Sequence, residues 1–235
     1  MQSLVPLWSQ RMRFEEINDS IVFFNWCFRR GSALIEAQSM KPTHLPKKLF
    51  TPLALAAALL LAGCVVTSIY PYFTDKDVVF APELVGAWQD VEPDHSEKEF
   101  WKFEKSGDKN YKFTVQDGDK ATTLDAHLFK LKSQIFLDAC PDQRPDDLIP
   151  PHYLLKMTFT ATNLQYSAMD YEWLEKHLTE NPGALRHHLV SQDPNDPEKK
   201  RLILTANTAE LQSFVLKHLT TEGAFSKSQE MKRRP

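Results

Sequence analysis

The chain has 235 residues, of which 42% are hydrophobic and 11% aromatic, enough for one core of ordinary size with attached segments. It carries 28 basic and 31 acidic residues, but residues 64–235 hold 21 Lys/Arg and 27 Asp/Glu, a formal net charge of −6. A mildly acidic module is poorly suited to bind the phosphate backbone of a nucleic acid, so we expect no nucleic-acid partner.

A stretch of 14 apolar or small residues runs from Leu53 to Val66. It is short for a membrane-spanning helix, which needs about 20 apolar residues. Lys41, Lys47 and Lys48 stand before it, and the order basic, apolar, small is that of an export signal. An uncleaved anchor or a buried helix is the alternative interpretation.

The sequence Leu61-Ala62-Gly63-Cys64 ends this stretch and resembles the lipobox of bacterial lipoproteins. In that family the cysteine thiol is alkylated by a diacylglycerol, the chain is cleaved before the cysteine, and the new amine is acylated. The resemblance covers residues 40–64 and implies that fatty acyl chains such as palmitate attach at Cys64. Each buried CH₂ contributes about 0.8 kcal/mol, so two or three chains hold a protein firmly on a membrane.

Val65 follows the cysteine where enterobacterial lipoproteins kept in the inner membrane have an aspartate. The resemblance therefore implies an outer-membrane location on the periplasmic face. If translation began at Met1, about fifty residues would precede the apolar stretch, whereas signal n-regions are short. Met40 begins a more normal signal, so we expect residues 1–39 to be a misassigned start or an unstructured leader; an amphipathic helix around Phe14–Trp26 is the alternative.

The three cysteines have different expected fates. Cys27 lies before the predicted cleavage point, and Cys64 would become a thioether, which leaves Cys140 without an intrachain partner. We expect Cys140 to be a buried small residue, because no sequence feature supplies an environment that stabilises a thiolate.

Residues 64–83 have the pattern of a lipidated cysteine followed by a tether. Pro71 and Pro82 interrupt any helix, and the apolar residues have no steady period. We expect Val78–Phe80 to pack on the domain. Three aromatic residues have two possible positions, against the headgroups or on the domain: Tyr70, Tyr72 and Phe73.

From Leu84 onward, apolar and polar residues alternate, which predicts half-buried strands. Short connectors at 106–110 and 117–119 carry the Gly, Asp and Asn that tight hairpins require. A phase slip at Phe129 predicts a β-bulge. Seven antiparallel strands are expected within 84–90, 99–105, 110–116, 122–131, 134–139, 152–159 and 163–168, and an eighth at 201–205.

Two helices are expected late in the chain. Asp170 can cap a helix over residues 171–181, and Asn207 with Glu210 has the spacing of a capping box for a helix over 207–219. We expect residues 84–222 to form the β-rich domain that includes these helices. Residues 223–235 then form a charged tail, either a solvated helix end or frayed.

About eight strands in a meander close most naturally as a small barrel or a strongly curved sheet, because closure removes exposed edges. Gly86-Ala87-Trp88 on the first strand resembles the Gly-x-Trp that opens lipocalin barrels, where the tryptophan plugs the closed end. The fold class is therefore mainly β (α+β), a lipocalin-like barrel with helices after strand seven and at the C-terminus.

No residue pattern indicates catalysis, a cofactor or a metal site. H-E-x-x-H, G-x-S-x-G, the P-loop and C-x-x-C are absent from the sequence. His187 and His188 are adjacent and point apart on a helix or strand. Four histidines stand singly in the sequence, and we expect the last two to pack on apolar helix faces: His127, His152, His177 and His218. Three carboxylates are expected on solvated faces, although the sequence does not exclude pairing in space: Asp125, Asp138 and Asp170.

An aromatic stripe on the predicted strands is either a plain core or the lining of a ligand cavity: Trp88, Trp101, Phe103, Tyr111, Phe113, Tyr153 and Phe159. A cavity would make the protein a membrane-held carrier of a small apolar ligand. The rival class is a non-catalytic module for interaction with an envelope protein or for envelope maintenance. An enzyme is the third class, and no motif supports it.

Overall fold

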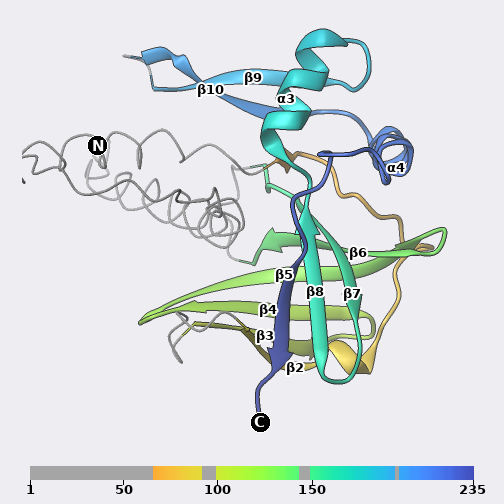
Figure 1. Ribbon diagram of the computed structural model, residues 1–235, viewed down its shortest axis with the longest axis vertical. Helices are drawn as coiled ribbons and strands as arrows, with labels where there is room; N and C mark the ends of the chain where they lie inside the picture. The colour runs from red at the N-terminus through yellow and green to blue at the C-terminus, as the bar shows by residue number, and fades with distance from the viewer. Residues whose placement is uncertain (1–65, 92–98, 143–148, 194–195) are drawn as a thin grey trace, which may run out of the picture. The chain divides into compact units, whose positions relative to one another are not determined.

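The computed structural model describes residues 66–91, 99–142, 149–193 and 196–235, and Val66–Pro235 is one compact unit. Eight strands build its barrel: β2 (Gly86–Asp90), β3 (Phe100–Ser106), β4 (Asn110–Asp117), β5 (Lys120–Leu131), β6 (Gln134–Pro141), β7 (Tyr153–Phe159), β8 (Asn163–Ala168) and β11 (Gln229–Arg233). They close in the order β11-β2-β3-β4-β5-β6-β7-β8, all antiparallel (Figure 1). The predicted lipocalin-like barrel is confirmed.

Each of the seven predicted strand segments forms a barrel strand, because alternate residues bury one face of the sheet. Phe103, Phe113 and Leu124 lie side by side on β3, β4 and β5 and are buried. Gly107 and Gly118 have positive φ angles, 70° and 58°, in the connecting turns, as the predicted hairpins require.

The predicted bulge at Phe129 is wrong, since β5 pairs with β6 in unbroken register through this region. Leu128 and Phe129 are both fully buried, Leu128 on the lumen side and Phe129 on the outer wall. The phase slip in the sequence therefore marks a strand covered on both faces.

The eighth barrel strand is not residues 201–205 but β11, inside the segment expected to be a charged tail. Met231 of β11 pairs with Asp90 on β2 and Leu164 on β8, and its side chain is buried (Figure 1, dark blue). The expectation of a helix end or frayed tail for 223–235 is thus corrected. One buried side chain among charged neighbours left no period-two signal for sequence analysis to find.

A second sheet contains β1 (Thr67–Ser68), β10 (Asp196–Leu204) and β9 (His187–Asp193), in the order β1-β10-β9. The predicted strand at 201–205 is the end of β10, which pairs antiparallel with β9 and parallel with β1. Val66, Thr67 and Ser68 are buried. The expectation of a tether is therefore wrong from Val66 onward, because this segment contributes a strand to a packed sheet.

Among the residues that the structure describes, three helical segments accompany the strands: η2 (Pro82–Leu84), α3 (Tyr171–Glu180) and α4 (Thr208–Lys217). Both predicted caps are confirmed. The Asp170 carboxylate accepts a hydrogen bond from the Trp173 amide at 2.8 Å, and Asn207 and Glu210 form a reciprocal capping box.

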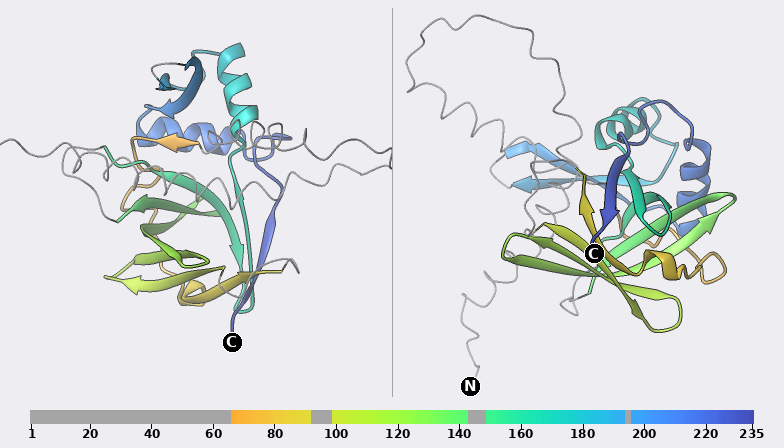
Figure 2. Two further views of the ribbon diagram at one scale, coloured as in Figure 1. Left: turned by 90° about the vertical axis from the view of Figure 1, so that its left-hand side faces the viewer. Right: turned by 60° about the horizontal axis from the view of Figure 1, so that its bottom comes forward.

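The helices and the small sheet cover the outer wall of the barrel and form a second core with it. Phe129, Phe136 and Leu154 contribute from the barrel, and Leu174 and Leu211 from the helices. In Figures 1 and 2, α3, α4 and the β9–β10 hairpin lie on the side of the barrel opposite η2. Within the described ranges, no helix has the length and apolar character that crossing a membrane requires.

Candidate functional site

Trp88 closes one end of the barrel. Its side chain is fully buried, and its indole Nε1 donates a hydrogen bond to the carbonyl oxygen of Leu84 at 2.9 Å. Leu84 ends η2, so the short helix lies across the barrel end that Trp88 fills.

Arg233, from the last strand, covers the same end. Its guanidinium carbon lies 4.4 Å from the centre of a Trp88 ring, a cation–π geometry. The guanidinium donates to three carbonyl oxygens: Val85 at 2.7 Å, Ala161 at 2.5 Å, and Glu83. Arg233 therefore joins β11 to η2 and to the β7–β8 turn, and sequence analysis missed it because one of three consecutive basic residues in a charged tail carries no signal of its own.

The aromatic stripe predicted from the sequence faces the lumen. Six of its seven side chains are buried, while Phe159, at the end of β7, is half-buried. The Trp101 ring lies 4.4 Å from that of Tyr166 and 5.1 Å from that of Phe113, measured between centroids. Because β2 and β11 separate β3 from β8, the contact between Trp101 and Tyr166 crosses the lumen, and this part of the barrel is filled by rings.

Tyr111 connects the barrel to the segment that precedes η2. Its hydroxyl accepts a hydrogen bond from the Ala81 amide at 2.7 Å and donates to the Ala81 carbonyl at 3.0 Å. Burial raises the pKa of Tyr111 above its usual value, so the phenol stays neutral. Tyr111, predicted to line a cavity, therefore binds the backbone of Ala81.

Asp138, expected on a solvated face, and His152, which stands singly in the sequence, form a pair on the outer wall. The Asp138 carboxylate, 1% exposed, lies 2.7 Å from His152 Nδ1 and accepts a hydrogen bond from the Tyr72 amide at 2.8 Å. The backbone of His152 exchanges two hydrogen bonds with Ser68, at 2.8 and 3.1 Å. The buried carboxylate therefore binds both His152, just before β7, and the segment that follows β1.

An aspartate at Nδ1 is also the arrangement that orients a catalytic imidazole. The hydroxyl of Ser68, whose backbone pairs with that of His152, donates instead to the Tyr70 carbonyl oxygen at 2.8 Å and is fully buried. Burial and then the charge of Asp138 raise the pKa of Tyr72, which holds that phenol neutral as well. The pair of Asp138 and His152 therefore has the geometry of a structural contact. Cys140, on the same strand, is buried, as predicted.

His177 and His218 meet between α3 and α4, with ring centroids 4.7 Å apart. Trp173 stacks on His177 and Phe214 lies against His218, so the predicted packing role is confirmed. The Nε2 atoms of both rings are buried without a hydrogen-bond partner. Burial, followed by the nearby His177 and the charge of Lys217, lowers the pKa of His218.

The other candidates do not converge on one site. His187 and His188 are successive residues of β9 and so face opposite sides of the sheet. His127 stacks on Phe73, and the Asp170 carboxylate caps helix α3. In the part of the chain that the structure describes, no three His, Cys, Asp or Glu residues come together in a way that could hold a metal ion.

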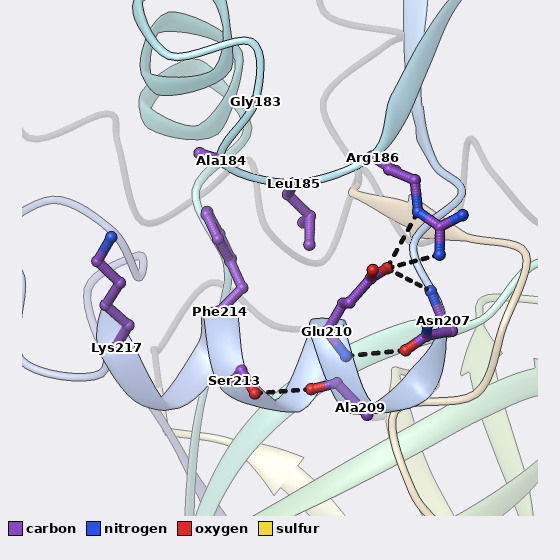
Figure 3. A pocket seen from close by; sticks show the side chains of 10 residues that line it. All are labelled: Gly183, Ala184, Leu185, Arg186, Asn207, Ala209, Glu210, Ser213, Phe214 and Lys217. Carbon is purple, nitrogen blue, oxygen red and sulfur yellow. Dashed lines mark hydrogen bonds and ion pairs between the residues drawn. The ribbon is translucent and has the colours of Figure 1, made fainter.

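An open groove of about 450 Å³ runs between α4 and the loop that precedes β9 (Figure 3). Arg186 on one side bonds Glu210 on the other at 2.8 Å, and the Glu210 carboxylate also accepts from the Asn207 amide. The charges of Arg186 and Glu210 neutralise each other, and Lys217 also lines the groove.

The lipidation residue Cys64 and the lipobox residues Leu61, Ala62 and Gly63 lie outside the described residues. Comparison of the whole chain with protein-family models, curated proteins and solved structures gave no match.

Proposed function

We propose that this protein is a lipoprotein of the bacterial envelope, held at the periplasmic face of the outer membrane by acyl chains on Cys64. The supporting observation is that the compact unit begins at Val66, two residues after that cysteine. Cleavage before Cys64 would therefore retain every contact of the described barrel and helices. Two or three acyl chains would supply stable anchoring without a membrane-spanning segment.

We further propose that the anchored barrel is a non-catalytic module that acts through its surface, in contact with an envelope protein or the membrane. The contact between Trp101 and Tyr166 across the lumen favours this role, because a carrier of a small apolar ligand needs a void of about 300 Å³ or more. The carrier is the second candidate, and it is favoured by the aromatic residues that line the lumen.

The anchor is tested by producing the full chain in a Gram-negative bacterium supplied with an alkyne-bearing fatty acid. Wild type should carry the label and have the mass of residues 64–235 plus a diacylglyceryl and an acyl group. Cys64→Ser should remain unlabelled, whereas the matched control Cys140→Ser should be labelled like wild type. An unlabelled, uncleaved wild-type chain in the cytosol would refute the proposal.

A further inference from the structure

The distance from the proposed anchor to the folded unit is very short. Val66 is 5% exposed, and β1 begins at the next residue. Two peptide links separate the Cα atoms of Cys64 and Val66, at most about 7 Å. Acyl chains on Cys64 would therefore hold the surface around the start of β1 close to the bilayer, since only Val65 stands between that cysteine and Val66 in the sequence.

The register of the small sheet shows which residues lie near that point. Thr67 pairs with Ile203 on β10, which pairs with His188 on β9. Toward the N-terminal end of β1, the next two residue pairs between β10 and β9 contain Leu189 and Val190 of β9. Neighbouring strands are about 4.8 Å apart, so these two residues lie roughly 10 Å to the side of the line along which the chain enters.

Leu189 and Val190 are conspicuously exposed for apolar residues, at 49% and 45%. Successive residues of a strand point to opposite faces, so both faces of β9 present an apolar side chain there. β9 is the edge strand of its sheet and pairs with β10. Exposed apolar side chains on an edge strand are a liability in a soluble protein unless something covers them.

The charge of this hairpin indicates what kind of surface would cover it. Residues 193–201 contain three acidic and three basic side chains, which balance: Asp193, Asp196, Glu198, Lys199, Lys200 and Arg201. Attraction to anionic headgroups would therefore contribute little, and contact would depend on insertion of apolar side chains. A headgroup layer is only about 5–7 Å deep on each side of a bilayer, within reach of a hairpin tied this closely to the anchor.

We propose that the β9 edge of the β9–β10 hairpin contacts the phospholipid surface beside the anchor, with Leu189 and Val190, on the two faces of that edge, at the boundary between headgroups and acyl chains. The inference rests on the proposed lipidation of Cys64. It orients the module, because the closed barrel end with η2 lies on the side opposite the hairpin and would face away from the membrane (Figures 1 and 2).

The test uses the lipidated protein reconstituted into phosphatidylcholine vesicles, in a Cys140→Ala background. The environment-sensitive fluorophore NBD is placed at Leu189→Cys, at Val190→Cys, or at the control Glu83→Cys on exposed η2. We expect blue-shifted emission at both hairpin positions and quenching by shallow spin-labelled lipid at least threefold stronger than at position 83. Having two hairpin positions keeps the test decisive if one variant fails to fold.

The outcomes separate the two proposals. An acyl mass on Cys64 with equally weak quenching at positions 189, 190 and 83 would overturn the hairpin contact while leaving the lipoprotein intact. Absence of the acyl mass would overturn both. A copurified protein that protects the hairpin labels even in detergent would also overturn the membrane contact. The hairpin would then bind a protein partner and not the membrane.

Discussion

Gly86 and Arg233 come together at the closed end of the barrel, where the guanidinium occupies the space that a side chain at Gly86 would need. A Cβ built on Gly86 would overlap Arg233 Nη1. The φ angle of Gly86 is +137°, a conformation that residues with a side chain rarely adopt. Glycine at this position is therefore required both by its backbone and by the cation above Trp88.

Gly86→Ala should lower the free energy of unfolding by roughly 3 kcal/mol or more, since it combines backbone strain with displacement of Arg233. Gly107→Ala is the matched control: its φ is also positive, at 70°, but nothing lies within 4 Å of its Cβ position. That control should cost only about 1 kcal/mol. Urea unfolding measures both, and equal losses would contradict the role of the close approach.

Arg233→Met should cost about 2–4 kcal/mol, because it removes the cation over Trp88 and leaves three carbonyl oxygens without their donor. Lys232→Met, at an exposed position of the same strand, should change stability by at most about 0.5 kcal/mol. Hydrogen exchange should also show faster opening of β11 in the Arg233 variant. An undisturbed β11 would mean that strand pairing alone closes the barrel.

Asp138→Ala should destabilise the fold by about 2–4 kcal/mol, because it leaves the Tyr72 amide and His152 Nδ1 without their buried acceptor. The specific readout is the Tyr72 amide, whose hydrogen exchange should accelerate more than that of barrel amides. Asp125→Asn, a half-buried carboxylate on β5, is the control and should cost at most about 0.5 kcal/mol. Unchanged hydrogen exchange at the Tyr72 amide would refute the structural role of Asp138.

Stability should fall as the pH drops below about 6.5, the pKa of histidine in an unfolded chain. The folded pKa of His218 is lowered, so the native state binds the proton less well than the unfolded state, and the stability gained with neutral His218 is lost on acidification. His218→Phe preserves ring packing and should reduce the change in melting temperature between pH 7.5 and 5. A pH dependence identical to wild type would exclude His218 as a source.

Trp101→Ala tests whether the lumen is a core or a ligand cavity. A filled lumen predicts a loss of about 3–5 kcal/mol and a new apolar void beside Phe113 and Tyr166 that binds benzene, which wild type does not. Calorimetric titration measures binding, and Trp173→Ala outside the barrel is the control. If wild type instead binds an apolar ligand and the Trp101 variant does not, the result would favour the ligand-carrier function.

The local features of this fold were predictable because they depend on neighbours in the chain. Strand alternation, glycine-containing turns and the caps at Asp170 and Asn207 each depend on side chains within a few positions of one another. The Gly-x-Trp triplet contains Trp88, whose buried indole Nε1 donates to the Leu84 carbonyl oxygen. Burial of both faces of β5 produced a misleading local signal at Phe129, since a strand covered on two sides loses its alternation.

The sequence by itself determined a strand-rich module with two capped helices behind an export-signal pattern, since periodicity and capping are read over short windows. Only the tertiary structure decided which strand closes the barrel, that Asp138 meets His152, and that Arg233 bonds a carbonyl 148 residues away. The physical reason is that these contacts are stabilised by burial and by long-range partners. Neither β11 nor Arg233 has a local preference strong enough to indicate its partner.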